Sequence, residues 1–325
     1  MRRRKTSGGI LTLLIIVLVI VFLYSGLRIL ESTVFYKEEK AQSVPSKTIT
    51  VDGVDYFPRQ DLEIYLLMGI DRFGPVQASN SYNNDGEADT LIVLAFDKTN
   101  ETIQIVSINR DSMVKMPVLG IGGKQAGTFF GQIALAHTYG SGLEDSCENT
   151  VRTVSDLLYG IPIDHYVSMN MDGIALINDA VGGVTVTVVD DFSAVDETIP
   201  LGEVTLRGEQ ATSFIRMRKG VGDQLNLSRM ERQKEYVTRF ADALRTKMES
   251  SAQFSLDLYD TIAPYIVTDC SGTVLSAAME RYADFDLQEI VSLQGENRIG
   301  DEFMEYHLDE EALTDLVLKL FFVKK

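Results

Sequence analysis

The fold is decided by three β-rich segments that lie close together: YLLMGI at 65–70, TLIVLAF at 90–96 and TIQIVSI at 102–108. The first is a short apolar run of the kind that forms a buried strand, and Asp71 follows its carboxyl end. The turn sequence KTNE at 98–101 joins the second segment to the third, which predicts an antiparallel hairpin. These strands are therefore expected to form the centre of a β-sheet.

Helical patterns and further strands alternate along the chain after this hairpin. Helices are predicted over 147–159, 171–180, 209–216 and 228–248, with strands over 163–169 and 184–189 between them. The last helix has the clearest signals, because Ser228 and Glu231 form a capping box. Alternation of this kind across 62–250 predicts the α/β class: a mixed central β-sheet with helices on both faces, an α-β-α sandwich. Residues 251–325 are expected to add further helix and an edge strand, without a separating linker.

The composition fits a folded domain with an acidic surface. Of the 325 residues, 45% are hydrophobic and 24% are charged, which allows a buried core. The formal net charge is −17, from 30 Lys and Arg against 47 Asp and Glu. This balance excludes a nucleic-acid-binding protein, because such a protein needs a basic surface to neutralise phosphates.

The N-terminus carries the signals of a membrane anchor. The run ILTLLIIVLVIVFLYSGL at 10–27 has no charged residue, and with its flanks it reaches the ~20 residues that a helix needs to cross a bilayer. The basic cluster from Arg2 to Lys5 precedes it, and such a cluster stays cytoplasmic. A cleaved signal peptide is the alternative, but its apolar core is usually ~7–15 residues long. The sequence YSGLR at 24–28 is also a poor cleavage site.

We therefore predict a cytoplasmic tail at 1–9, a transmembrane helix at 10–30, an extracellular stalk at 31–60 and an extracellular domain at 61–325. The protein would be a single-pass protein of the cell membrane, with its bulk outside. Cys147 and Cys270 both lie in the exported part. They could form a disulfide or stay as two separate buried thiols, and the sequence does not distinguish these alternatives. No zinc site is expected, since the chain has three histidines and no C-x-x-C motif.

Charged residues collect at the ends of the predicted strands and helices. They are Asp71, Arg72, Asp89, Arg110, Asp111, Arg216, Arg218, Arg229 and Arg232. Open α/β sheets build their binding sites at strand ends. Two carboxylates there suit Mg²⁺, which prefers oxygen ligands, and several guanidiniums suit a pyrophosphate. Ordinary surface ion pairs are the alternative interpretation for any single arginine.

Six motifs, in order across residues 62–245, resemble those of the LytR-CpsA-Psr family. They are GID (69–71), EADT (87–90), SINRDS (107–112), IPIDHYV (161–167), VGGVTV (181–186) and RMRKGVGDQLNLSRMERQ (216–233). The predicted topology of a short cytoplasmic tail and one anchor is also similar to that of the family. The resemblance implies the α-β-α fold of these proteins.

The resemblance also implies a membrane-anchored phosphotransferase of the Gram-positive envelope. Such an enzyme moves a glycopolymer, for example teichoic acid or capsular polysaccharide, from an undecaprenyl pyrophosphate carrier to a peptidoglycan sugar hydroxyl. Asp71 and Asp89 would then hold Mg²⁺ (or Mn²⁺). The pyrophosphate ligands would be Arg72, Arg110, Arg216, Arg218, Arg229, Arg232 and Gln233. Asp89, Arg110 and Asp111 would act in catalysis, with Asp89 or Asp111 as the candidate base.

Three of the motifs depart from the family pattern. Glu87-Ala88 stand where the family commonly has Arg-Ser, and Asn226 stands where an acidic residue is usual. SINRDS at 107–112 stands for SIPRDT, which keeps Arg110 and Asp111 but loses a proline. Two other functions therefore stay open. One is a pyrophosphatase that delivers polyprenyl pyrophosphate to water, and the other is a non-catalytic envelope-binding or signalling protein.

Overall fold

The computed structural model describes residues 48–217, 220–221, 232, 235–236, 238–240, 242–244, 246–247, 250–251, 253–282, 285–300 and 303–324. The predicted cytoplasmic tail and transmembrane helix, and the stalk up to residue 47, lie outside these residues. Among the helices that are described, none combines the length and apolar character needed to cross a membrane.

A seven-stranded mixed sheet forms the centre of the molecule. Its strands are β3 (Leu62–Ile70), β4 (Ala88–Asp97), β5 (Thr102–Ile108), β8 (His165–Asn170), β11 (Ile266–Thr268), β12 (Asp286–Leu287) and β13 (Val291–Ser292). The order is β11-β8-β3-β4-β5-β12, and β13 also pairs with β5. β4 and β5 form the predicted hairpin, while β3 pairs with β8 in parallel. The expectation of a mixed sheet is confirmed.

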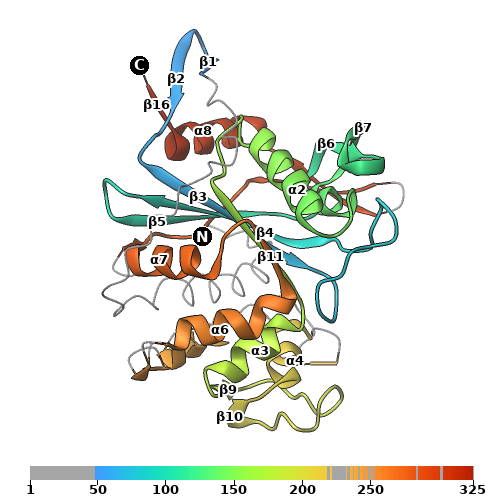
Figure 1. Ribbon diagram of the computed structural model, residues 1–325, viewed down its shortest axis with the longest axis vertical. Coiled ribbons are helices and arrows are strands. Elements are labelled where there is room, and N and C mark those ends of the chain that lie inside the picture. The colour runs from blue at the N-terminus through green and yellow to red at the C-terminus, as the bar shows by residue number, and fades with distance from the viewer. Residues whose placement is uncertain are drawn as a thin grey trace, which may run out of the picture.

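Helices cover both faces of this sheet, as the sandwich prediction requires (Figure 1). α2 (Glu144–Leu157) and α8 (Glu310–Phe321) lie on one face, which we call the α2 face. On the other, the α4 face, lie α3 (Gly173–Ala180), α4 (Glu209–Arg216), α6 (Phe254–Ile262) and α7 (Gly272–Tyr282). Alternate residues of β3 divide between the faces: Leu66 and Met68 join the core under α2, and Tyr65 and Leu67 join the other core.

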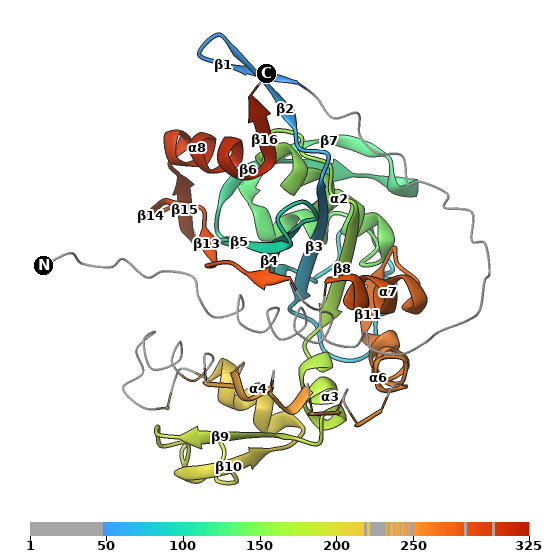
Figure 2. The same cartoon turned by 90° about the vertical axis from the view of Figure 1, so that its left-hand side faces the viewer.

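Small sheets and short helices complete the fold (Figure 2). Three two-stranded ladders pair β6 (Met113–Leu119) with β7 (Gln125–Gln132), β9 (Val184–Val188) with β10 (Gly202–Leu206), and β14 (Gly295–Ile299) with β15 (Met304–Leu308). The 3₁₀ helices are η1 (Ile121–Gly123), η2 (Ile133–Thr138) and η3 (Ala263–Tyr265). The described residues between 232 and 250 are helical, in agreement with the predicted helix at 228–248.

One part of the predicted stalk is folded instead. Residues 49–58 form β1 (Ile49–Val51) and β2 (Val54–Pro58), and β2 also pairs with β16 (Phe322–Lys324) at the C-terminus. Asp52 and Gly53 turn the chain between β1 and β2 with φ angles of 50° and 76°. An Asp-Gly pair favours this tight hairpin turn, and it is the signal that the stalk prediction overlooked.

The two cysteines are free thiols, and both are buried. Cys147 lies on α2 and contacts the hydroxyl of Ser168 at 3.4 Å, whereas Cys270 follows β11. Of the two possibilities that the sequence left open, the structure therefore has the separate thiols.

Candidate active site

Four elements bring charged side chains to one end of the sheet. Asp71 follows β3, Asp89 is the second residue of β4, Arg110 lies two residues after β5, and Arg216 is the last residue of α4. β3 runs antiparallel to β4, and β4 runs antiparallel to β5. The carboxyl ends of β3 and β5 therefore meet the start of β4, which places the four residues together.

A bulge in the β3–β4 ladder holds the two carboxylate residues side by side. The pairing register shifts between Gly69 and Ile70. Beyond the shift, the carbonyl oxygen of Glu87 accepts a hydrogen bond from the amide of Asp71 at 3.0 Å and from that of Asp89 at 3.1 Å. Bulges of this kind re-aim side chains beside functional sites. Here the shared acceptor fixes the backbone of both aspartates around one atom.

Arg110 is the cation at the centre of the cluster. Its guanidinium hydrogen-bonds the carboxylate of Asp89. It also lies 3.5 Å from a carboxylate oxygen of Asp111 and 3.7 Å from one of Glu87. The Arg110 side chain is 42% exposed, so it remains accessible to a ligand from solvent. Three carboxylates surround this half-exposed guanidinium, so an incoming phosphate must compete with them to bind Arg110.

Arg216 approaches the same place from the α4 face. Its Nη2 atom lies 3.6 Å from Oδ1 of Asp71. Its guanidinium also lies over the ring of Phe73, 5.5 Å from the ring centroid, in a cation–π contact. Because α4 ends at this residue, the side chain projects from the rim of the helix towards the sheet end. Asp71 and Phe73 therefore position this second cation.

Burial raises the pKa of the Asp89 carboxyl above its usual value, and the nearby Asp71 carboxylate acts in the same direction. Arg110 and Arg216 oppose this rise. Burial lowers the pKa of the Arg110 guanidinium, but Asp89 and Asp111 raise it and outweigh the burial. The site thus concentrates negative charge in a partly desolvated place, and this arrangement favours the binding of a further cation.

The donor atoms at this point suit a hard divalent cation. Asp71 and Asp89 offer carboxylate oxygens, with side-chain exposures of 45% and 19%, from two adjoining strand ends. Mg²⁺ is commonly held by one or two carboxylates together with substrate phosphates. The residues therefore fit the predicted cation in number and chemistry.

Two predicted site residues take part less directly. Arg72 pairs with the exposed Asp85 at 3.7 Å and lines an adjoining cavity of about 240 Å³ that also reaches Phe73 and His137. The carboxylate of Asp111 accepts a hydrogen bond from the side-chain amide of Gln132 at 2.8 Å. This amide holds the Asp111 carboxylate in place beside the Arg110 guanidinium.

The structure corrects the prediction for Arg232, whose side chain is only 2% exposed. Its guanidinium pairs with Asp190 and donates to the carbonyl oxygens of Phe214 at 3.0 Å and Met217 at 2.5 Å. It also lies 5.3 Å from the ring centroid of Phe192. Since all three of its nitrogens are engaged in the interior, Arg232 cannot bind a pyrophosphate. It instead secures the end of α4, from which Arg216 projects.

The remaining predicted ligands cannot be placed. Arg218, Arg229 and Gln233 lie outside the described residues, and so does Asn226. Asp71, Asp89, Arg110, Asp111 and Arg216 are brought together. A sequence-based search for charged residues overlooked Phe73, although a large aromatic residue directly after Asp71-Arg72 in a polar loop was the available signal.

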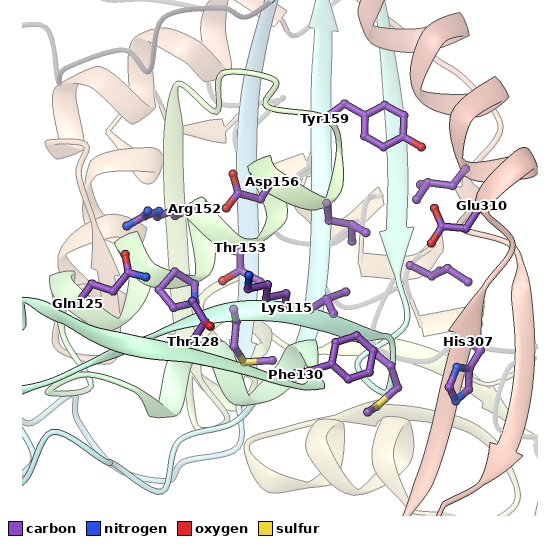
Figure 3. A pocket seen from close by; sticks show the side chains of 17 residues that line it. Lys115, Gln125, Thr128, Phe130, Arg152, Thr153, Asp156, Tyr159, His307 and Glu310 are labelled. Atoms are coloured by element: carbon purple, nitrogen blue, oxygen red, sulfur yellow. The ribbon is translucent and has the colours of Figure 1, made fainter. Parts of the chain in front are cut away.

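A further cavity of about 570 Å³ lies on the α2 face, between β6, β7, α2 and α8 (Figure 3). Its labelled side chains include the cations Lys115 and Arg152 and the carboxylates Asp156 and Glu310. None of the clustered aspartates and arginines lines it. The cavity is therefore separate from the candidate active site.

Comparison with known proteins agrees with the motifs. A model of the LytR_cpsA_psr family matches residues 23–320. The polyisoprenyl-teichoic acid–peptidoglycan teichoic acid transferase TagU of Bacillus subtilis (strain 168) is 28% identical over 330 residues, covering 98% of this chain and 97% of its own. The TagU of Halalkalibacterium halodurans is 30% identical over 236 residues, covering 72% of this chain and 67% of its own.

Solved structures share the fold. The crystal structure of B. subtilis TagV superposes with a TM-score of 0.56 at 26% identity, covering 81% of this chain and 96% of that one. A structure of TagT bound to LI-WTA superposes with a TM-score of 0.55 at 22% identity, over 80% and 90% of the two chains. The family model spans most of the sequence and the six motifs fall within it, so this chain belongs to the LytR-CpsA-Psr family.

Proposed function

We propose that this protein transfers a teichoic-acid-type glycopolymer from a polyisoprenyl pyrophosphate carrier to a sugar hydroxyl of peptidoglycan. The names of its relatives support this substrate pair, since TagU and TagV are called polyisoprenyl-teichoic acid–peptidoglycan teichoic acid transferases. The observation that carries the proposal is the cluster of Asp71, Asp89, Arg110 and Arg216 at one end of the sheet. A pyrophosphate needs cations on its oxygens, and this cluster supplies two guanidiniums in reach of solvent.

In the reaction, the acceptor hydroxyl oxygen attacks the phosphorus nearest the glycopolymer. The bond from that phosphorus to the bridging oxygen breaks, and polyisoprenyl phosphate leaves. Arg110 and Arg216 bind the phosphate oxygens and neutralise the charge that develops on the leaving group, which is the main catalytic contribution in phosphoryl transfer. Asp71 and Asp89 would hold a divalent cation, Mg²⁺ or Mn²⁺, which supplies further positive charge to the pyrophosphate when bound.

The proton of the acceptor hydroxyl passes to a carboxylate of this cluster. Asp111 fits this role because the side-chain amide of Gln132 fixes its carboxylate at 2.8 Å and it is not one of the two proposed metal ligands. Asp89 is the other candidate, since burial raises its pKa and makes its ionised form a stronger base. A carboxylate that holds a metal ion is a weaker base, so occupancy by the cation favours Asp111 for this step.

We also propose that the protein is anchored by residues 10–30 with its described domain outside the cell membrane. The basic residues before that run and its unbroken apolar character support this topology. A lipid carrier and a peptidoglycan acceptor would meet at the outer face of the cell membrane.

The test is a transfer assay with the purified full-length chain, a lipid-linked glycopolymer and a peptidoglycan acceptor, with and without Mg²⁺. Arg110→Ala and Asp89→Ala should each lower the rate by about 100-fold or more, as loss of a group that stabilises transition-state charge does. Arg239→Ala is the matched control, because that arginine is 51% exposed and pairs with Glu235 one helical turn away. A wild-type rate from Arg110→Ala would refute the assignment.

The product distinguishes the other two functions. A covalent peptidoglycan adduct supports the transferase, whereas free glycan phosphate in the presence of acceptor identifies a pyrophosphatase. Binding of polyprenyl pyrophosphate without any turnover identifies a non-catalytic envelope protein.

A further inference from the structure

A second cluster of potential metal ligands lies at the opposite end of the sheet. One ligand atom each of His165, Asp269 and Cys270 lies within 4.8 Å of the other two. His165 begins β8, and the other two residues follow β11, which pairs with β8. The antiparallel β8–β11 pair thus joins ligands that are more than 100 residues apart in sequence.

We propose that His165, Asp269 and Cys270 form a site for a thiophilic divalent cation, Zn²⁺ in particular. Sulfur, imidazole nitrogen and carboxylate oxygen together are typical of zinc and differ from the all-oxygen sets that Mg²⁺ prefers. The proposal is independent of the transferase function. It also revises the expectation from the sequence that there is no zinc site, which relied on the absence of C-x-x-C and on the low number of histidines.

The Asp269 carboxylate lies at ligand-to-ligand spacing from both the imidazole and the thiol, through a different oxygen for each. With metal bonds of about 2.0 Å to N and O and about 2.3 Å to S, a tetrahedral ion separates N from O by about 3.3 Å and S from O by about 3.5 Å. Nδ1 of His165 lies 3.2 Å from Oδ2 of Asp269, and Sγ of Cys270 lies 3.6 Å from Oδ1 of that residue. Small side-chain rotations would complete the arrangement, with a water as the fourth ligand.

The surroundings favour a cation that can enter from solvent. The side chains of His165 and Asp269 are 30% and 25% exposed, whereas Cys270 is buried beneath them. Asp164, the chain neighbour of His165, adds negative charge, whereas Glu63 is paired with Arg281 at 3.4 Å and with Lys98 at 3.9 Å. The ring of Tyr65 lies against the imidazole, with the ring centroids 4.9 Å apart, and restricts its orientation.

Metal binding exchanges protons for the ion. The Cys270 thiol loses its proton to solvent as the Zn–S bond forms, and any proton on Nδ1 of His165 is likewise released as the Zn–N bond forms. The Asp269 carboxylate binds in its ionised form. No oxidant or reductant is involved.

The position of this cluster assigns it a structural role. His165 pairs with Tyr65, and Asn170 pairs with Ile70 at the end of β3 that leads to Asp71. Five residues of strand separate the two ends, or about 16 Å at 3.2–3.4 Å per residue. An ion at His165 would therefore not touch the reacting groups. It would tie β8 to the segment between β11 and α7.

The test is a Co²⁺ titration of the untagged full-length chain, stripped of metal and kept in excess Mg²⁺ to occupy oxygen-only sites. Co²⁺ replaces Zn²⁺ in such sites and gives a thiolate-to-metal charge-transfer absorption that only sulfur ligation produces. We expect this band in the parent chain, its loss on addition of Zn²⁺, and a rise in Tm with Zn²⁺.

Cys270→Ser should abolish the band and weaken Zn²⁺ binding by about 10-fold or more, and His165→Asn should weaken binding to a similar extent. Cys147→Ser is the matched control and should keep the band, because that thiol contacts the hydroxyl of Ser168 at 3.4 Å and Nε2 of His137 at 3.9 Å, away from Asp269. Circular dichroism verifies that each variant is folded. No band in the parent, a band that persists in Cys270→Ser, or a band lost only in Cys147→Ser would each overturn the proposal.

Discussion

Replacement of Arg232 by Met tests whether this arginine belongs to the interior or to the substrate site. The methionine retains an unbranched apolar side chain but removes the guanidinium, and so leaves the Asp190 carboxylate and the carbonyls of Phe214 and Met217 without that partner. Breaking a buried ion pair by removing one partner costs about 3–5 kcal/mol. We expect a loss of this size in the free energy of unfolding, because the Arg232 side chain is only 2% exposed.

Urea unfolding of the purified protein measures this loss. The chain has 13 tyrosines and no tryptophan, so tyrosine fluorescence and far-ultraviolet circular dichroism are the two probes. At about 2–4 °C per kcal/mol for a chain of this size, Tm should fall by roughly 6–20 °C. In a double-mutant cycle, Asp190→Asn should have a much smaller effect in the Arg232→Met background than in the parent.

Arg239→Met is the matched control, since it makes the same substitution in the same helical segment. Arg239 is 51% exposed and pairs with Glu235 at 3.1 Å, so its loss should change stability by less than about 1 kcal/mol. If Arg232→Met unfolds like the parent but binds polyprenyl pyrophosphate more weakly, the interior assignment is refuted and the guanidinium acts on substrate.

Three further predictions concern single side chains. Burial lowers the pKa of His137 to about 4, so folding keeps this imidazole neutral while the unfolded chain takes up a proton near pH 6.5. The free energy of unfolding should therefore fall by about 2 kcal/mol between pH 7 and pH 5. His137→Asn should remove that part of the pH dependence in urea titrations. Glu87→Gln releases one of the anions that compete for Arg110, and it should tighten binding of a polyprenyl pyrophosphate by up to about 5-fold in calorimetry, whereas weaker binding would contradict the competition. Phe73→Ala removes the aromatic face beside Arg216, and it should raise the KM for the lipid substrate by about 2–5-fold. Tm should not change, because the phenylalanine is 63% exposed. An unchanged KM would show that the ring does not position the arginine.

The central strands were predictable because their side chains are buried, so the apolar residues that form the core also mark the strands in the sequence. The runs at 65–70 and 90–96 are almost continuously apolar, the run at 102–108 alternates, and all three form strands of the central sheet. The hairpin of β6 and β7 was not predicted, since most of Gln125–Gln132 is exposed and its sequence lacks a regular apolar alternation. A strand with few buried side chains has no alternation of apolar and polar residues from which it could be predicted.

The site was predictable to the extent that it depends on strand ends. Asp71, Asp89 and Arg110 follow or begin apolar strands, and an antiparallel sheet brings such positions together. Arg232 could not be assigned in this way. Its burial depends on Asp190, 42 residues away, and on carbonyls at the end of α4, which no local spacing reveals. The ligands around Cys270 were overlooked for the same reason.

The pairing of β2 with β16 determines when the domain can finish folding. Pro58, near the start of the described chain, pairs with Phe322, near its end. β8 likewise requires β11, and the outer edge of β5 requires β12 and β13. Contacts between distant parts of a chain form late, since long loops must close first. If the chain is exported from its N-terminus, as proposed, β1 and β2 can pair with each other early, but β2 lacks its other partner until Phe322–Lys324 have crossed. The few residues of β16 then complete this small sheet, so deletion of Phe322–Lys324 is expected to weaken it.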